Sequence, residues 1–165
     1  MGQSLSAMRK QLEKENICDC LKGRIKYFVT LYRESHDGWE GRISVILDDK
    51  EVFRSNTFEW HYLTHKVWES VNRDDEKLTI ESHKEGVVNV YSFYNAFYFY
   101  QNHSISENLS SEDALVRLFA VLDKRVGKRT LKKLETDLPL QPQWLQFFYR
   151  LRLEAEGIIK ATSPN

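Results

Sequence analysis

The sequence predicts an α+β protein with an N-terminal helix, a three-stranded antiparallel meander over about 24–55, and then a mostly helical C-terminal half. Two observations support this prediction. Apolar and polar residues alternate through the meander, and from residue 58 onward apolar residues recur every three or four positions, which is helical spacing. Strands and helices are therefore segregated along the chain, as in α+β folds.

The length of 165 residues and the hydrophobic content of 41% fit a single globular domain over 1–165. We expect residues 1–56 to hold the helix and the meander, 57–157 to be helical, and 158–165 to be a tail. The chain start lacks the apolar run of a secretory signal, and no stretch of about 18 apolar residues predicts a membrane span. These features favour a cytoplasmic protein.

The first third of the chain contains the predicted helix and the meander. Leu5, Met8 and Leu12 recur at helical spacing and predict a short amphipathic helix over 4–16. Period-two alternation, rich in β-branched and aromatic residues, predicts three strands that follow one another through short polar turns. The strands cover 24–33, 41–47 and 50–55, and the turns lie at His36-Asp37-Gly38 and Asp48-Asp49-Lys50.

Helices are predicted for the rest of the chain, although residues 77–100 leave helix and strand open. Leu78-Thr79-Ile80 favours a strand, whereas the following Gly86 is typical of a helix end, and helix is the interpretation adopted. Thr57 and Ser92 are predicted N-caps. Ser110 and Asp113 have the spacing of a capping box, with Asp in place of Glu. The remaining helices are predicted over 58–72, 111–125, 128–135 and 142–156, the last closed by Gly157.

Charge is balanced in total and unevenly distributed. The 24 basic and 24 acidic residues give zero net charge, which argues against bulk attraction to nucleic acid or an acidic membrane. Residues 117–133, however, hold seven basic side chains and one acidic one. Lys124, Arg125, Lys128 and Arg129 of this segment are candidates for binding a phosphate or nucleic acid. The favoured alternative is a solvated helix pair whose basic side chains meet the acidic remainder of the protein.

Two small groups of residues could hold a metal. Cys18 and Cys20 are one residue apart, so they rarely meet disulfide geometry, and no second Cys pair completes a four-ligand zinc site. We interpret them as reduced thiols between the first helix and the first strand. His61 and His65 are four residues apart on a predicted helix and are weak candidates, because Tyr62 stands where the H-E-x-x-H motif needs Glu.

Enzyme and cofactor signatures are otherwise lacking in the sequence. Ser35, His36 and Asp37 contain the residue types of a catalytic triad, but the triad's hydrogen-bond chain normally joins distant segments rather than neighbours. The residues around Gly127-Lys128 do not match a P-loop, and no dinucleotide-binding motif occurs. The sequence therefore predicts no catalytic residue and no cofactor.

Several segments together are similar to a family of small uncharacterised bacterial proteins. The most specific are Leu122-Asp123-Lys124-Arg125-Val126-Gly127-Lys128-Arg129, with the pattern L-D-[KR]-R-V-G-K-R, and Leu151-Arg152-Leu153-Glu154-Ala155-Glu156-Gly157, with the pattern L-R-x-E-A-E-G. The resemblance covers roughly 7–157, although the extreme N-terminus lacks an expected Trp. It implies a bacterial cytosolic protein and transfers no activity and no catalytic residue.

These features favour a non-enzymatic binding protein with a protein partner that the sequence does not identify. Some of Trp39, Trp60, Trp68 and Tyr98 are expected to anchor that partner. The first alternative is a nucleic-acid or phosphate binder that uses the basic segment 117–133. The second is a metal-dependent enzyme around His61 and His65. The oligomeric state stays open.

Overall fold

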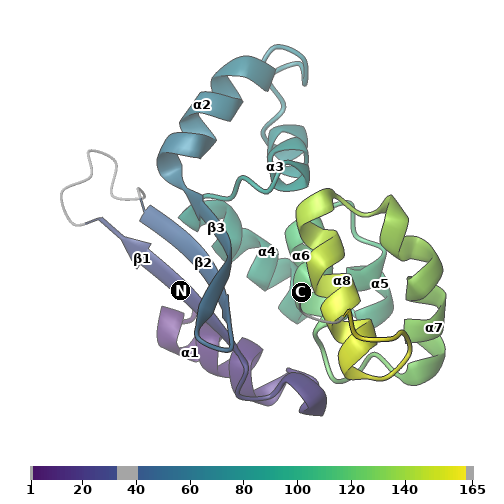
Figure 1. Ribbon diagram of the computed structural model, residues 1–165. Coiled ribbons are helices and arrows are strands. Elements are labelled where there is room, and N and C mark those ends of the chain that lie inside the picture. Colours follow the sequence, from purple (N-terminus) through teal and green to yellow (C-terminus); the bar gives the residue numbers. More distant parts are fainter. Residues whose placement is uncertain (1, 33–40, 163–165) are drawn as a thin grey trace.

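The computed structural model describes residues 2–32 and 41–162. Its sheet lies on one side of the molecule, α7 and α8 lie on the other, and α4 and α6 lie between them, while α2 and α3 project together from one end (Figure 1). The helices are α1 Leu5–Lys10, α2 Thr57–Val67, α3 Asp75–Lys84, α4 Val90–Asn102, α5 Ile105–Leu109, α6 Ala114–Val121, α7 Lys128–Asp137 and α8 Gln143–Ala155. A π-helical turn, Gln11–Glu15, and two 3₁₀ turns, Asp19–Leu21 and Leu138–Leu140, complete the helical elements.

The predicted meander is confirmed. Strands β1 Ile25–Leu31, β2 Gly41–Leu47 and β3 Lys50–Asn56 pair antiparallel in the order β1-β2-β3. Asp48 and Asp49 both have positive φ, as a tight two-residue hairpin turn requires. The predicted turn at His36-Asp37-Gly38 and the position of Trp39 lie outside the described residues.

Close backbone contact shapes the start of β2. An added Cβ at Gly41 would lie 2.0 Å from the carbonyl oxygen of Thr30 on β1, so only glycine fits this approach. The Gly41 N–H also donates to Thr57 Oγ1 at 2.8 Å, which ties the first residue of β2 to the start of α2. The sheet and the first of the projecting helices are thus joined at one buried point.

For α2 and α3 the sequence correctly predicted helices, but it misplaced the residue at which α2 begins. The stretch around Leu78 is helical, and Gly86 follows α3 with φ +75°, as expected for a helix end. The N-cap of α2, however, is Asn56 rather than Thr57, because the Asn56 side chain and Glu59 form a reciprocal capping box. The Thr57 hydroxyl instead donates to the Gly41 carbonyl.

The predicted caps of the next helices are also displaced. Asn89, not Ser92, caps α4, because the Ser92 hydroxyl turns back to the Asn89 backbone from the third helical position. Residues 105–109, which the sequence prediction left unassigned, form the short helix α5, and Ser110 ends it rather than starting α6. Asp113 alone caps α6, so the predicted start at residue 111 is wrong.

One buried cluster connects the sheet with the C-terminal helices. Tyr27 of β1 packs against Phe93 of α4 and Phe119 of α6, with ring centroids 6.3 and 5.9 Å apart. Phe93 and Phe119 meet edge to face at 5.5 Å. The cavity described below is bordered by both α4 and α6, so this aromatic packing fixes two of its walls.

The C-terminal helix α8 is held by the fully buried Arg152. Its guanidinium donates to the carbonyl oxygens of Val121, Asp123 and Val126 at 2.8–2.9 Å, and its Nε lies 3.0 Å from a carboxylate oxygen of Glu156. The chain between α6 and α7 therefore wraps around a side chain from α8. Among the described residues, every helix is too short or too polar to cross a membrane.

Candidate functional site

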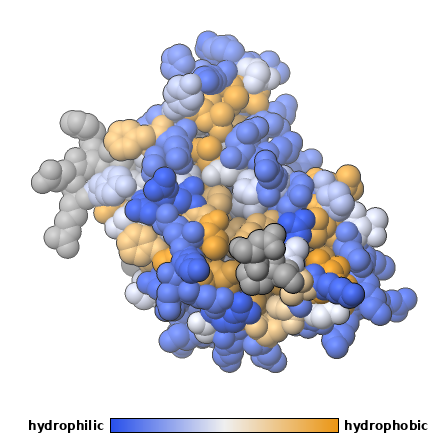
Figure 2. Space-filling model, in the orientation of Figure 1, coloured by the Kyte–Doolittle hydropathy of each residue, from blue (hydrophilic) through white to orange (hydrophobic). Residues whose placement is uncertain are grey.

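A cavity of about 760 Å³ lies where α2 and α3 meet α4 and the segment before α6. Its volume falls within the usual range for small-molecule sites. Figure 2 shows hydrophobic side chains in the middle of the face drawn, among hydrophilic residues, with further hydrophobic side chains near its edges. The lining residues are Trp60, Asp75, Glu76, Leu78, Thr79, Ile80, Asn89, Tyr91, Ser92, Asn95, Ala96, Phe99, Ser111, Glu112, Asp113 and Val116.

Three helix N-termini converge on this cavity. Asp75 and Glu76 occupy the first turn of α3, Asn89 caps α4, and Asp113 caps α6. Acidic residues are common at such positions because they accept from free backbone N–H groups and because the helix dipole favours them. Each N-terminus supplies roughly half a positive charge, so the three together offset less than half of the charge on the four lining carboxylates. The cavity is therefore an anionic site.

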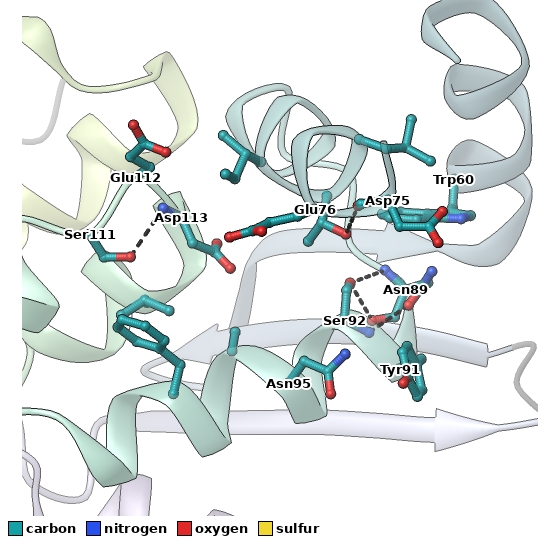
Figure 3. Close-up of a pocket in the computed structure, with 16 residues that line it drawn as sticks. Trp60, Asp75, Glu76, Asn89, Tyr91, Ser92, Asn95, Ser111, Glu112 and Asp113 are labelled. Atoms are coloured by element: carbon teal, nitrogen blue, oxygen red, sulfur yellow. Dashed lines mark hydrogen bonds between the residues drawn. The ribbon is translucent and has the colours of Figure 1, made fainter. Parts of the chain in front are cut away.

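Lysine and arginine do not neutralise the acidic side chains of the cavity in the described part of the chain. Within residues 2–32 and 41–162, no Lys or Arg forms an ion pair with Asp75, Glu76, Glu112 or Asp113. Figure 3 shows Glu76 and Asp113 pointing toward one another from opposite sides of the cavity. Two carboxylates that face each other repel, so a cation between them would be stabilised by both.

Aromatic rings complete the wall of the cavity. Trp60 of α2 and Tyr91 of α4 line the cavity (Figure 3), and so does Phe99, which also belongs to α4. Tyr91 is 56% and Phe99 39% exposed, which is high for large apolar side chains. An organic cation gains both from an aromatic face and from a nearby carboxylate. The combination of rings and carboxylates suits an ammonium or guanidinium group better than a hydrated metal ion.

A hydrogen-bond chain of Asp, His and Ser borders the same cavity. His83 of α3 is fully buried, and its Nδ1 lies 2.6 Å from Asp113 Oδ1 while its Nε2 lies 2.9 Å from Ser92 Oγ. These residue types and contacts are those of an acyl-transfer triad. The Ser92 hydroxyl, however, is also held by the backbone of Asn89 at 3.0 and 3.1 Å, and the residue is 3% exposed.

This arrangement gives the chain a structural role. A buried imidazole needs a partner at each nitrogen, and Asp113 and Ser92 supply both. Because His83 lies in the last turn of α3, Ser92 in the first turn of α4 and Asp113 at the N-cap of α6, the chain ties the end of α3 to the starts of α4 and α6. The helix α8 is also bound to His83, because the indole N–H of Trp144 on α8 donates to the His83 carbonyl at 2.9 Å. His83 thus positions the cavity without access to a ligand.

The predicted basic residues lie far from this cavity, around the α6–α7 connection. Arg125 is bound by the buried carboxylate of Asp123, with contacts of 2.8–3.1 Å. Lys124, Lys128 and Arg129 are exposed, and in the described part of the chain no carboxylate pairs with them. The Arg125–Asp123 pair lies within the basic segment itself, so for these four residues the described part of the chain shows no pairing with the acidic remainder of the protein.

The two predicted metal-binding groups differ in their surroundings. His61 and His65 are exposed on α2, and no third His, Cys, Asp or Glu forms a ligand cluster with them among residues 2–32 and 41–162. Cys18 and Cys20 lie together, with Sγ atoms 3.3 Å apart, and Glu156 of α8 joins them. Burial, together with the neighbouring Cys18 and Glu156, raises the pKa of the Cys20 thiol to about 12.

Comparison with known proteins places the chain in an uncharacterised class. The model of the SF0329 protein family matches residues 4–153, which is most of the chain, so the protein belongs to that family. No curated protein and no solved structure matches it. The family membership predicted from the sequence is thereby confirmed, and it supplies no activity.

Sequence reasoning found one residue of the cavity wall and missed the rest. Trp60 was among the expected anchors and Asp113 was expected only as a helix cap, and no binding role was assigned to Asp75 or Glu76. The acids at 74–76 and 112–113 were a usable signal, because acidic residues at helix starts lie close to free backbone N–H groups. Their convergence on one cavity depends on tertiary packing, which no local pattern reports.

Proposed function

We propose that this protein is a non-enzymatic binding protein whose anionic cavity receives a basic side chain, arginine or lysine, from a protein partner. The observation that carries the proposal is the pair Glu76 and Asp113, which face the same space from two elements. Asp113 is bound on one oxygen by the buried His83, and among the described residues no Lys or Arg pairs with either carboxylate. A cation supplied by a partner would replace the repulsion between them with two attractions. Aromatic residues of the cavity wall such as Trp60 would cover its apolar stem.

A partner protein suits the site better than a free small cation. Phe58 and Tyr62 on α2 are 71% and 67% exposed, so this helix also presents large apolar side chains at the surface. Aromatic residues are enriched at the centres of protein–protein interfaces, where they act as anchors. The family resemblance and the two free cysteines support a bacterial cytoplasmic location for this interaction.

The test uses a probe peptide, acetyl-Gly-Arg-Gly-Arg-Gly-amide, and its twin with citrulline at both arginine positions. Citrulline keeps the shape of arginine and removes the charge, so titration calorimetry should detect the arginine peptide and not the citrulline peptide. The double variant D75N/E76Q should weaken binding roughly fivefold or more, the effect of losing about 1 kcal/mol of charge interaction. Equal binding of the two peptides, or none at millimolar concentration, would contradict the proposal.

A matched control separates local charge from net charge. Glu85 and Glu135 are exposed acids outside the cavity, so the double variant E85Q/E135Q changes the net charge equally. It should bind the arginine peptide as the natural protein does. Thermal melts of both double variants check that the fold is intact, because removing acids from the first turn of α3 costs about 0.3–1 kcal/mol each.

The basic segment supports a second candidate, binding of a phosphate or nucleic acid through Lys124, Lys128 and Arg129. The specific observation is that these three side chains are exposed and have no acidic partner among the described residues. Arg125 would contribute less, because Asp123 already occupies its guanidinium. Retention of labelled DNA or RNA across a salt series tests this candidate, and binding must weaken steeply with salt. Absence of binding at about 50 mM salt would eliminate it.

A further inference from the structure

The two cysteines of the chain meet a carboxylate from the other end of the molecule. Cys18 precedes the 3₁₀ turn Asp19–Leu21, and Cys20 lies within it. Cys20 Sγ lies 3.3 Å from Cys18 Sγ and 3.3 Å from a carboxylate oxygen of Glu156, which follows α8. The three donor atoms all lie within 4.8 Å of one another. Residues that are 136 positions apart are thus placed as a compact S,S,O donor set.

Each donor is held by its own backbone or side-chain contacts. The Cys18 N–H donates to the Leu122 carbonyl at 2.8 Å, next to the bridge between Ile17 and Asp123. Cys18 is 1% exposed. Glu156 is fixed by Arg152, whose Nε lies 3.0 Å from the carboxylate oxygen that Cys20 also contacts. The second oxygen of Glu156 takes part in neither contact, so it can serve as a ligand while the pair with Arg152 is kept.

The spacing of the donors is close to that of a tetrahedral zinc site. With Zn–S bonds of about 2.3 Å and a tetrahedral angle, two thiolates on one ion lie about 3.7–3.8 Å apart. The observed 3.3 Å differs from this by roughly half an ångström, which side-chain torsions absorb without movement of the backbone. A disulfide would need the same sulfur atoms to approach to about 2.05 Å in a loop with a single intervening residue.

The local charge also favours a divalent cation. With both thiols deprotonated, the donor set carries three negative charges, and the buried Arg152 supplies one positive charge. A divalent cation brings the group to neutrality, which is the condition under which charges can be buried without a large penalty. Burial and the neighbouring Cys18 and Glu156 raise the pKa of the Cys20 thiol. A raised thiol pKa makes Cys20 a poor nucleophile, which disfavours a redox or catalytic role for it.

We propose that Cys18, Cys20 and Glu156 form a binding site for one thiophilic divalent cation, such as Zn²⁺. Thiolates select such ions over Mg²⁺ and Ca²⁺, which require oxygen ligands. Three protein donors leave a fourth tetrahedral position, and because Cys20 and Glu156 are only partly buried, that position is accessible to water or to a further ligand. The ion would tie the segment before β1 to the end of α8. This site is separate from the anionic cavity and does not depend on the function proposed above.

Cobalt is the appropriate probe, because Co²⁺ bound by thiolate shows sulfur-to-metal charge-transfer absorption. The chain has only two cysteines, so any such absorption reports this pair. Titration of reduced, metal-stripped full-length protein should give a charge-transfer band that saturates at one Co²⁺ per chain. One equivalent of Zn²⁺ should abolish the band. The variant H61A/H65A should titrate as the natural protein does, since those side chains lie outside the donor set.

Substitution of Glu156 tests the three-donor arrangement without touching the thiols. E156Q should weaken Co²⁺ binding at least tenfold, as loss of a ligand or its support does. E154Q, two residues earlier, is the matched control and should leave the affinity unchanged. C20S should remove the charge-transfer band. Where C20S does not fold, the natural protein supplies the same information, because bound Zn²⁺ should protect Cys20 from an alkylating reagent.

Three results would overturn the proposal. One is a reduced protein that develops no charge-transfer band with excess Co²⁺. Another is an unchanged affinity in E156Q, which would show that the carboxylate is not a ligand. The third is a protein whose two thiols form a disulfide, seen as a loss of two mass units, while Zn²⁺ fails to protect them against alkylation after reduction.

Discussion

Replacing Arg152 with methionine should cause a larger loss of stability than any exposed substitution on α8. The guanidinium is 1% exposed and donates to the carbonyl oxygens of Val121, Asp123 and Val126, besides its ion pair with Glu156. Methionine fills much of the same space and supplies no donor. R152M therefore leaves three backbone acceptors and one partly buried carboxylate without their partner.

The magnitude follows from these four contacts. Removing one partner from a buried ion pair costs about 3–5 kcal/mol, because the other charge and the acceptors stay desolvated. The whole folded state of a typical domain is worth only about 5–15 kcal/mol. For a chain of this length, 1 kcal/mol shifts the melting temperature by roughly 2–4 °C, so R152M should lower it by roughly 6–20 °C.

Urea denaturation followed by circular dichroism measures the change. The control is R150M on the same helix, because Arg150 is exposed and should change the free energy of unfolding by less than about 0.5 kcal/mol. An R152M protein within about 1 kcal/mol of the natural one would refute the reasoning. Such a result would mean that water replaces the guanidinium and that Arg152 does not hold the α6–α7 connection.

The remaining predictions concern an ionisation, a close contact and a hydroxyl. Burial raises the pKa of the Tyr149 phenol to about 12. Between pH 10 and 12 the phenol is therefore neutral in the folded protein and ionised in the unfolded chain. Its contribution to stability is complete below pH 10 and is lost as the pH rises through this range. Y149F should reduce that alkaline loss, measured by urea midpoints at pH 8 and pH 11. G41A should cost at least about 2 kcal/mol, whereas G127A, whose added Cβ meets nothing within 4 Å, should cost less than 1. Ser92 should resist fluorophosphonate labelling in the folded protein, as read by mass spectrometry, and stoichiometric labelling would instead indicate a catalytic serine.

The spacing of apolar residues predicted whether each long element is a strand or a helix, because buried residues recur every second position in a strand and every three or four positions in a helix. The alternation in β1 places Ile25, Tyr27 and Val29 in the core and Lys26 and Phe28 outside. The helical stretch around Leu78 was the ambiguous case, since three residues cannot distinguish periods of 2 and 3.6. The boundaries were less predictable because several polar residues near each start can cap, and tertiary hydrogen bonds select one of them. Thr57, for example, donates to Gly41 instead of capping α2.

The segments that carried the family resemblance turn out to be in contact. Arg152 belongs to the L-R-x-E-A-E-G ending, and it donates to the carbonyls of Asp123 and Val126 within the L-D-[KR]-R-V-G-K-R segment. Glu156 of the same ending pairs with Arg152 and contacts Cys20. Every residue has a backbone carbonyl, so a guanidinium that binds carbonyls does not require particular residue types at those positions. Only the structure, therefore, could show why these two segments occur together.

The cavity could not have been predicted from the sequence, for a related reason. Asp75, Glu76 and Asp113 each have a local explanation at a helix start, which is complete without a ligand. What distinguishes them is that α3 packs beside the starts of α4 and α6, to which the buried His83 ties its last turn, so that the acids line one cavity. The charge sum of the chain gives no indication of this, because zero net charge is compatible with an anionic cavity on one face and exposed lysines on another.

The most direct test of the proposed function is the ¹H–¹⁵N signal of the Trp60 indole, assigned by comparison with W60F, during titration with the arginine and citrulline peptides. Trp60 lines the cavity, so occupation of the cavity by a guanidinium must change its environment. The proposal predicts a saturable shift with the arginine peptide that is reduced in D75N/E76Q and in high salt, and no shift with citrulline. An unchanged Trp60 signal at millimolar arginine peptide, or identical shifts with the two peptides, would contradict it.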